Sequence, residues 1–204
     1  FMDSVLNLLE NYPEPAIRVL MNHLGTHDTM RILTRLGKND SFCGDRDWQS
    51  QQSLSKEEYE NGIKRLRLAA VIQYTLPGVP SLYYGDEAGM QGYGDPFCRG
   101  TYPWGKENKE LLEFYRWLGA IRKDNSVFDG GEFKSIFGGL GLISYTRENE
   151  TDKILIAINR WSEDDYLEIP NEFINSEVIY GNKPYDNKLK IAKQDFAILK
   201  IKKR

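Results

Sequence analysis

The stretch NHLGTHDTMRILTRLG, residues 22–37, decides the fold of this chain. An extended apolar lead-in over residues 19–24 changes here into a helical pattern, and His27 and Asp28 stand side by side at the change. Side chains at the carboxyl ends of the strands of a β/α barrel project into one shared pocket. The stretch therefore predicts a strand, then a candidate site at His27 and Asp28, then a helix.

A second run, LPGVPSLYYGDEAGMQGYGDPFCRGTYPW at residues 76–104, gives the next strand. The helix before it opens with a capping-box pattern at Ser55 and Glu58 and carries apolar residues at helical spacing. Residues 80–84 are then predicted as a short apolar strand, which is parallel to the first if the helix is a crossover. A long loop follows, over residues 85–108.

The first half of the chain is predicted as alternating helices and short strands. The helix at the start stops before Tyr12 and Pro13, and Pro15 opens a second short helix. The remaining expected elements are a strand at residues 21–25, a helix at 29–37, an irregular segment at 38–53 and a last helix at 111–124.

The second half changes to alternating or continuously apolar runs, which are typical of strands. Residues 154–158 are apolar without interruption, as expected of a strand buried on both faces. No helical pattern interrupts the expected strands, which are residues 140–147, 153–159, 166–169, 177–180 and 196–201. We therefore expect an α/β domain over residues 1–125 and an all-β, antiparallel sandwich domain over residues 126–204.

Composition narrows the classes of function. The 204 residues carry a formal charge of −3, which argues against a nucleic-acid or membrane surface, and no apolar run is long enough to span a membrane. Cys43 and Cys98 could pair, but two free thiols in a reducing compartment are favoured, because their spacing indicates neither a disulfide framework nor a metal site. An inert Cys98 is favoured over an activated thiol. The chain opens on Phe1 inside a helical pattern, so we expect it to be part of a longer protein.

The candidate site residues also have structural interpretations. Asp28 could cap the helix that follows it, and the local sequence alone favours this. His27 could be a buried, hydrogen-bonded core histidine. Asp86 and Glu87 lie at the end of the second strand, where a catalytic group would be expected by position.

The two runs resemble the α-amylase superfamily of glycoside hydrolases, especially its neopullulanase and cyclomaltodextrinase branch. The match is carried by residues 24–33 and 76–90, and by Asp95-Pro96, Arg99 and Pro103-Trp104. The resemblance implies that the two strands are the seventh and eighth of a TIM (β/α)8 barrel, so that residues 1–125 are its C-terminal part. Thr26, Met30 and Gly100 depart from the commonest family pattern. These departures leave open which branch of the family the chain resembles and which glycosidic linkage is preferred.

The resemblance also implies roles for residues. The nucleophile and the general acid of such enzymes follow the fourth and fifth strands, which these runs do not include. His27 and Asp28 correspond to the histidine and third carboxylate after the seventh strand, which bind the distorted sugar. With the second run present, this role outweighs the cap and the core histidine. Asp95 and Arg99 are expected to bind hydroxyls of glucose units beyond the cleavage point, and a salt bridge that only fixes the loop is the alternative.

Other groups are assigned less directly. Trp104, Tyr93 and Phe97 could stack on sugar faces or could cover the barrel mouth. The resemblance places the three acidic groups of the reaction elsewhere than Asp86 and Glu87. No cofactor or metal site is expected in this chain, and a calcium ion would belong to the missing part of the parent protein.

We therefore expect the parent to be a hydrolase that cleaves α-glucosidic bonds in maltodextrins, cyclodextrins or pullulan with retention. The alternatives are a transglucosylase of the same superfamily and a non-catalytic amylase-like carbohydrate-binding or partner protein. Intact His27 and Asp28 weigh against the non-catalytic alternative. The expected partner is an α-glucan, with no nucleic acid and no membrane. This chain alone is expected to be inactive and to self-associate through its truncated barrel.

Overall fold

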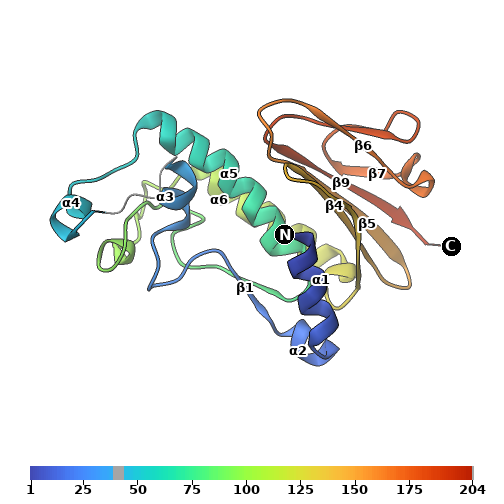
Figure 1. Ribbon diagram of the computed structural model, residues 1–204, viewed down its shortest axis with the longest axis horizontal. Coiled ribbons are helices and arrows are strands. Elements are labelled where there is room, and N and C mark those ends of the chain that lie inside the picture. The colour runs from blue at the N-terminus through green and yellow to red at the C-terminus, as the bar shows by residue number, and fades with distance from the viewer. Residues whose placement is uncertain (39–43, 204) are drawn as a thin grey trace. The chain divides into compact units, whose positions relative to one another are not determined.

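The computed structural model describes residues 1–38 and 44–203. The chain divides into two compact units, and each is described by itself. The helical unit comprises residues 21–74 and 80–121, and the sheet unit comprises residues 1–20, 75–79 and 122–204. Figure 1 shows the order of their helices and strands. The expected domain boundary after residue 125 stays a prediction.

Two long helices dominate the helical unit. They are α5 (Lys56–Thr75) and α6 (Lys109–Asp124), and they pack against each other through aromatic rings. The guanidinium of Arg67 lies 4.4 Å from the ring centroid of Phe114, and the rings of Tyr74 and Tyr115 meet edge to face with their centroids 6.0 Å apart.

The start of α5 confirms the predicted capping box. The backbone N–H of Ser55 donates to Glu58 Oε2 at 2.7 Å, and the N–H of Glu58 donates to Ser55 Oγ at 3.2 Å. Each side chain therefore satisfies a donor that the first helical turn leaves without a partner.

The strands of the helical unit are short. β1 (Met21–His23) and β2 (Val79–Ser81) are neighbours in a two-stranded sheet. The side chain of Gln73 donates to the carbonyls of Asn22 and Ser81, both at 2.9 Å. One buried amide from α5 thus holds both strands in place.

Two expectations for this unit are corrected. The helix predicted from Thr29 begins later, as α3 (Ile32–Gly37). The segment 38–53, predicted to be irregular, contains α4 (Arg46–Ser50), whose N-cap Asp45 accepts a hydrogen bond from the Trp48 N–H at 2.9 Å. A helix of five residues is too short to show hydrophobic periodicity, so its only sequence signal is the cap. The long loop after β2 also contains one 3₁₀ turn, η1 (Phe97–Arg99).

The sheet unit begins with two helices and continues as antiparallel sheets. The helices are α1 (Met2–Asn11) and α2 (Glu14–Arg18), and a 3₁₀ turn, η2 (Ser126–Phe128), precedes the strands. The larger sheet has the order β3-β4-β5-β9-β7 and the smaller pairs β6 with β8. The strands are β3 (Glu132–Gly138), β4 (Leu142–Glu148), β5 (Asp152–Asn159), β6 (Asp165–Glu168), β7 (Glu177–Tyr180), β8 (Lys188–Ile191) and β9 (Asp195–Lys202).

The strand β5 lies at the centre of the larger sheet. It pairs in unbroken register with β4 on one side and with β9 on the other. Residues 154–158 are all buried, which confirms the prediction from their apolar run. The core cluster draws on both sheets, with Leu142, Leu155, Ala157, Ala197 and Leu199 from the larger and Leu167, Leu189 and Ile191 from the smaller.

Two strands of this unit were not predicted. In β3 the alternation is broken by a bulge between Ser135 and Phe137, and β8 has only four residues. A 3₁₀ turn, η3 (Asn171–Phe173), also interrupts the series of strands, and its Phe173 is fully buried. Short or bulged strands give too few alternating residues for a sequence pattern.

A buried arginine on β4 is paired with carbonyls of the sheet unit, to which Thr75 also belongs. The guanidinium of Arg147 donates to the carbonyls of Thr75 at 2.8 Å and Gly131 at 2.9 Å. Burial lowers the pKa of Arg147 to about 10, and the nearby charge of Arg122 adds to this. The cation meets the negative end of the helix, which offsets part of the cost of burying it.

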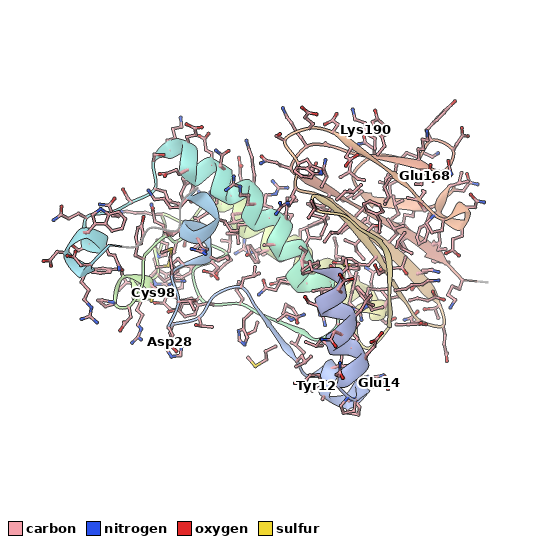
Figure 2. All side chains as sticks on the ribbon, in the orientation of Figure 1. Tyr12, Glu14, Asp28, Cys98, Glu168 and Lys190 are labelled. Atoms are coloured by element: carbon pink, nitrogen blue, oxygen red, sulfur yellow. The ribbon has the colours of Figure 1, made fainter. Side chains whose placement is uncertain are left out.

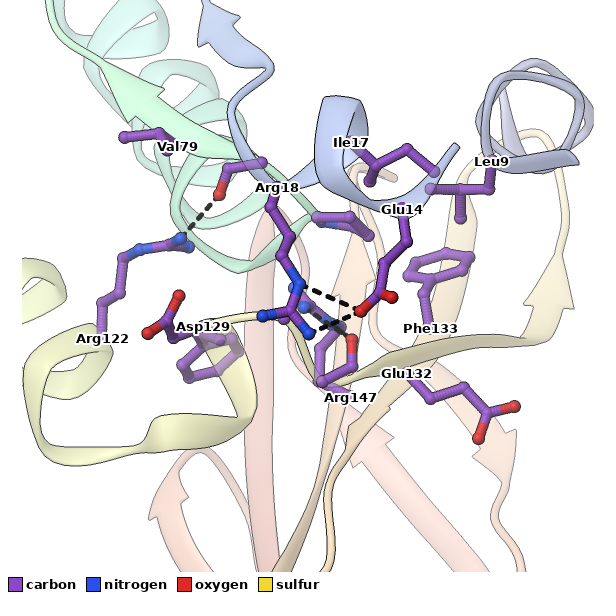
Figure 3. A pocket seen from close by; sticks show the side chains of 15 residues that line it. Leu9, Glu14, Ile17, Arg18, Val79, Arg122, Asp129, Glu132, Phe133 and Arg147 are labelled. Atoms are coloured by element: carbon purple, nitrogen blue, oxygen red, sulfur yellow. Dashed lines mark hydrogen bonds and ion pairs between the residues drawn. The ribbon is translucent and has the colours of Figure 1, made fainter. Parts of the chain in front are cut away.

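A cavity of about 380 Å³ lies beside this arginine in the sheet unit (Figure 3). The guanidinium of Arg18 donates to the carboxylate of Glu14 at its edge, at 3.0 Å. The cavity is lined by none of the four site residues that the sequence predicts. Among the described residues, no helix is long and apolar enough to cross a membrane.

Candidate functional site

His27 and Asp28 lie in an exposed turn that follows β1. The N–H of Thr29 donates to the Thr26 carbonyl at 3.3 Å, and the N–H of Asp28 donates to Thr26 Oγ1 at 3.3 Å. The side chains of His27 and Asp28 are 67% and 71% exposed, and His27 Nε2 lies 3.3 Å from Asp28 Oδ2. The turn therefore presents an imidazole and a carboxylate together to solvent.

Both structural interpretations of this pair are wrong. The helix α3 begins at Ile32 with Arg31 as its N-cap, so Asp28 does not cap it. His27 is largely exposed, so it is not a buried core histidine. The exposure of both groups leaves them available to a ligand.

The guanidinium of Arg99 brings the four predicted site residues together. Its Nε donates to the His27 carbonyl at 3.0 Å and lies 3.1 Å from Asp95 Oδ1. Its Nη2 lies 3.5 Å from Asp28 Oδ1. The predicted bridge between Asp95 and Arg99 is therefore present, and Arg99 also reaches back to the turn after β1.

These ion pairs contribute little to stability. The side chains of Arg99 and Asp95 are 45% and 44% exposed, so water screens their attraction. Exposed pairs of this kind contribute about 1 kcal/mol or less. The cluster is thus better suited to exchange its hydrogen bonds with a ligand than to hold the fold.

Cys98 lies beneath the cluster and is fully buried. Its Sγ donates to the carbonyl of His27 at 3.2 Å, and Figure 2 shows Cys98 and Asp28 near each other. Its thiol is free, and its burial agrees with the interpretation of an inert cysteine. The other cysteine, Cys43, lies outside the described residues.

A buried ion pair that the sequence did not predict lies next to this cluster. Arg31 and Asp86 are each 1% exposed, and Arg31 Nη1 lies 3.3 Å from Asp86 Oδ1. Burial raises the pKa of Asp86 to about 6, although the charge of Arg31 acts in the opposite direction. Spacing gives no signal for this pair, because its members are 55 residues apart in the chain.

Asp86 and Glu87 lie in the loop after β2, which ends at Ser81 rather than at the predicted residue 84, and both are engaged locally. Asp86 faces Arg31, and Glu87 Oε2 accepts a hydrogen bond from the Gly85 N–H at 2.8 Å. These contacts give both carboxylates structural partners. They agree with placing the acidic groups of the reaction elsewhere.

The aromatic residues around the loop differ in exposure. Tyr93 is 2% exposed and meets the ring of Trp48 edge to face at 5.2 Å, so it is not an open stacking surface. Trp104 is 82% exposed, and its ring centroid lies 4.5 Å from that of Tyr102. The hydroxyl of Tyr84 donates to the Gly100 carbonyl at 2.8 Å.

The chemistry of the cluster suits a polyhydroxylated ligand. Carboxylates accept hydrogen bonds from hydroxyls, whereas guanidinium and imidazole N–H groups donate to them, and charge strengthens both kinds of bond. Within the described residues, no group of three or more His, Cys, Asp or Glu side chains could hold a metal ion.

The α-amylase catalytic-domain family model matches residues 4–136. The chain belongs to the α-amylase family. Amylopullulanase of Thermoanaerobacter thermohydrosulfuricus is 39% identical to it over 143 residues, which cover 70% of this chain and 9% of that protein. Cyclomaltodextrinase of Thermoanaerobacter pseudethanolicus is 30% identical over 170 residues, which cover 82% of this chain and 25% of that protein. The chain thus spans a quarter or less of the length of these relatives.

Solved structures show the same fold. A debranching enzyme of Nostoc punctiforme aligns with a TM-score of 0.75 and 23% identity, over 97% of this chain and 37% of that one. The α-amylase of Geobacillus thermoleovorans, complexed with acarbose, aligns with a TM-score of 0.75 and 21% identity, over 100% of this chain and 43% of that one. The combination of an α/β part and antiparallel sheets is therefore shared with α-amylase enzymes.

Proposed function

We propose that this chain is part of a retaining hydrolase of α-glucosidic bonds in maltodextrins, cyclodextrins or pullulan. In this proposal β1 and β2 are the seventh and eighth strands of a (β/α)8 barrel, and residues 126–204 form a C-terminal antiparallel β-sandwich. Membership of the α-amylase family supports the proposal, as do the names of relatives such as amylopullulanase and cyclomaltodextrinase.

The observation that carries the proposal is the contact of Arg99 with three groups. It pairs with Asp95 and Asp28 and donates to the His27 carbonyl. In this proposal Asp28 and His27 contact the sugar at the cleaved bond, and Asp95 and Arg99 bind hydroxyls of glucose units further along.

The mechanism follows from the charges. Glycosidic cleavage passes through an oxocarbenium-like transition state with a flattened ring. A carboxylate and an imidazole donor that fit the hydroxyls of the distorted ring better than those of the relaxed ring lower the barrier. Arg99 Nη2 lies 3.5 Å from Asp28 Oδ1, so the carboxylate already faces a cation before the ring distorts.

The test is the reaction of the full-length protein that contains this chain. We expect release of reducing sugar from at least one of maltodextrin, cyclodextrin and pullulan, with the α-anomer formed first in a proton NMR time course. No release from any of the three, or initial formation of the β-anomer, would contradict the proposal.

The 204-residue chain alone is proposed to be inactive on the same substrates. The nucleophile and the general acid, each required by the two-step mechanism, are proposed to lie on other segments of the protein. Turnover by the purified chain that a mock preparation lacks would contradict this.

A further inference from the structure

Arg31 occupies a position between the two parts of the candidate site. It follows Asp28 by three residues, and its side chain enters the loop after β2. Its Nη1 donates to the Tyr84 carbonyl and to Asp86, and its guanidinium lies 4.3 Å from the Tyr83 ring centroid and 4.6 Å from that of Tyr84.

The backbone of Arg31 also contacts this loop. Its N–H donates to the Gly92 carbonyl at 2.9 Å, and the Gly92 N–H donates to Thr34 Oγ1 at 2.8 Å. The turn that carries His27 and Asp28 is therefore joined to the loop through both the main chain and the side chain of one residue.

The far end of the loop returns to the same turn. Tyr84, which Arg31 contacts, donates from its hydroxyl to the Gly100 carbonyl, and the adjacent Arg99 donates to the His27 carbonyl. Together with the chain from Asp28 to Arg31 and the peptide bond between Arg99 and Gly100, these contacts form a closed circuit from Asp28 through Arg31, Tyr84 and Arg99 back to Asp28. We expect a displacement of the Arg31 side chain to shift both the turn that carries Asp28 and the loop that carries Arg99.

Stability alone does not explain a buried pair of this kind. Replacing a buried ion pair by well-packed apolar residues is often neutral or stabilising. Arg31 Nε is buried and has no hydrogen-bond partner among the described residues, which adds an uncompensated cost. Burial also raises the pKa of Asp86, which shows that removing its carboxylate from water is unfavourable too. What the pair supplies is a fixed geometry.

We propose that the Arg31–Asp86 pair is a positioning device that holds Asp28 and Arg99 in register for the reaction. Arg31 does not contact the substrate in this proposal, and it acts through Tyr84 and the loop. The inference rests on the proposed function of the Asp28 cluster and adds the buried pair to it.

The test is a kinetic double-mutant cycle in the full-length protein. Arg31→Lys keeps the positive charge but loses the planar guanidinium that lies over the Tyr83 and Tyr84 rings and fixes the Nη1 donor between Tyr84 and Asp86. We expect kcat to fall by about 10²-fold with a smaller change in KM, because a small misplacement of a catalytic group has an effect of that size. In the Asp28→Asn background the same change should lower kcat by no more than about twofold, because the two residues act as one unit.

Arg65→Lys is the matched control. Arg65 also donates to a backbone carbonyl of the helical unit, that of Leu36 at 2.7 Å, but it makes no contact with the circuit in the described residues. We expect its kcat to stay within about twofold of the wild type in either background. Equal effects of Arg31→Lys and Arg65→Lys, or effects of Arg31→Lys and Asp28→Asn that multiply, would overturn the proposal.

Two further measurements keep the test decisive. Should Arg31→Lys unfold, Asp86→Asn takes its place in the same cycle, with the same expected coupling to Asp28. Should the wild type cleave no α-glucan, the proposed function fails, and hydrogen exchange decides the inference. Faster exchange of the amides of residues 26–29 in Arg31→Lys, but not in Arg65→Lys, supports the positioning device, and unchanged exchange overturns it.

Discussion

Asp28 is the residue on which the proposed reaction depends most directly. In the full-length protein, we expect Asp28→Asn to lower kcat by about 10²-fold or more, with a smaller change in KM. The reason is that, in the proposed reaction, its contact with the sugar is strongest when the ring is distorted. Initial rates over a range of maltodextrin or cyclodextrin concentrations give both constants.

Asp45→Ala is the contrasting variant for that prediction. Asp45 caps α4, whereas Asp28 caps no helix, so the Asp45 variant should lose about 1 kcal/mol of stability and keep its kcat. The Asp28 variant should show the opposite pattern. Retained turnover in Asp28→Asn together with a lowered melting temperature would return Asp28 to a purely structural role.

Asp86 gives the protein a pH dependence of stability with a defined sign. Its pKa is raised from an ordinary value of 3.8 to about 6, first by burial, so the folded state holds the proton more strongly than the unfolded state. The stability this provides is fully present below about pH 4 and is lost as the pH rises through about 6. A shift of about two units corresponds to about 3 kcal/mol.

The variant Asp86→Asn removes this titration. We expect the stability of the wild type relative to Asp86→Asn to decrease between pH 4.5 and pH 7.5, as measured by thermal melting at each pH. Asp95→Asn is the control for removing a carboxylate from the same loop. A difference between wild type and Asp86→Asn that is constant with pH would contradict the assignment.

Among the elements, α5 offers the clearest test of a local signal. Ser55 Oγ accepts the Glu58 N–H at the helix start, so Ser55→Ala should lower the free energy of unfolding by about 1 kcal/mol. Ser53→Ala, two residues earlier and also exposed, serves as the control and should change it little. Equal effects of the two changes in urea denaturation would show that the capping box does not stabilise α5.

The same element shows what the sequence could predict. A twenty-residue helix with a capping box and the continuous apolar run of β5 were both predicted correctly, because each carries many residues of one pattern. The elements β3, β8 and α4 were missed because each is short or bulged, and partners distant in sequence determine them. Local patterns do not contain that information.

The candidate site also contains residues that the sequence could predict and one that it could not. His27, Asp28, Asp95 and Arg99 could be named from the sequence through the resemblance, and the structure brings them together. The contribution of Arg31 could not be predicted, because a charged residue at the start of a helical pattern is usually solvated. Only the fold shows that it is buried and paired with a residue from another loop.

At the scale of the whole molecule, the two-stranded sheet leaves strand edges without partners. Among the described residues, β1 and β2 pair only with each other, so each has one edge without a partner strand. Large apolar side chains along them are exposed, including Met21 of β1 at 60% and Val79 of β2 at 44%. Unpaired edges with apolar neighbours are surfaces on which other chains add strands.

The 204-residue chain is therefore expected to self-associate through β1 and β2. Met21→Lys combined with Val79→Lys should shift the chain towards monomer, because lysine on an edge strand opposes pairing with another chain. Light scattering over a range of concentrations measures this. Leu140→Lys is the control, because Leu140 is 87% exposed but lies in the connection between β3 and β4. A wild-type chain that stays monomeric at high concentration would show that it does not self-associate. An equal effect of Leu140→Lys would show that β1 and β2 are not the surface of association, since pairing at strand edges requires that only charges on these strands oppose it.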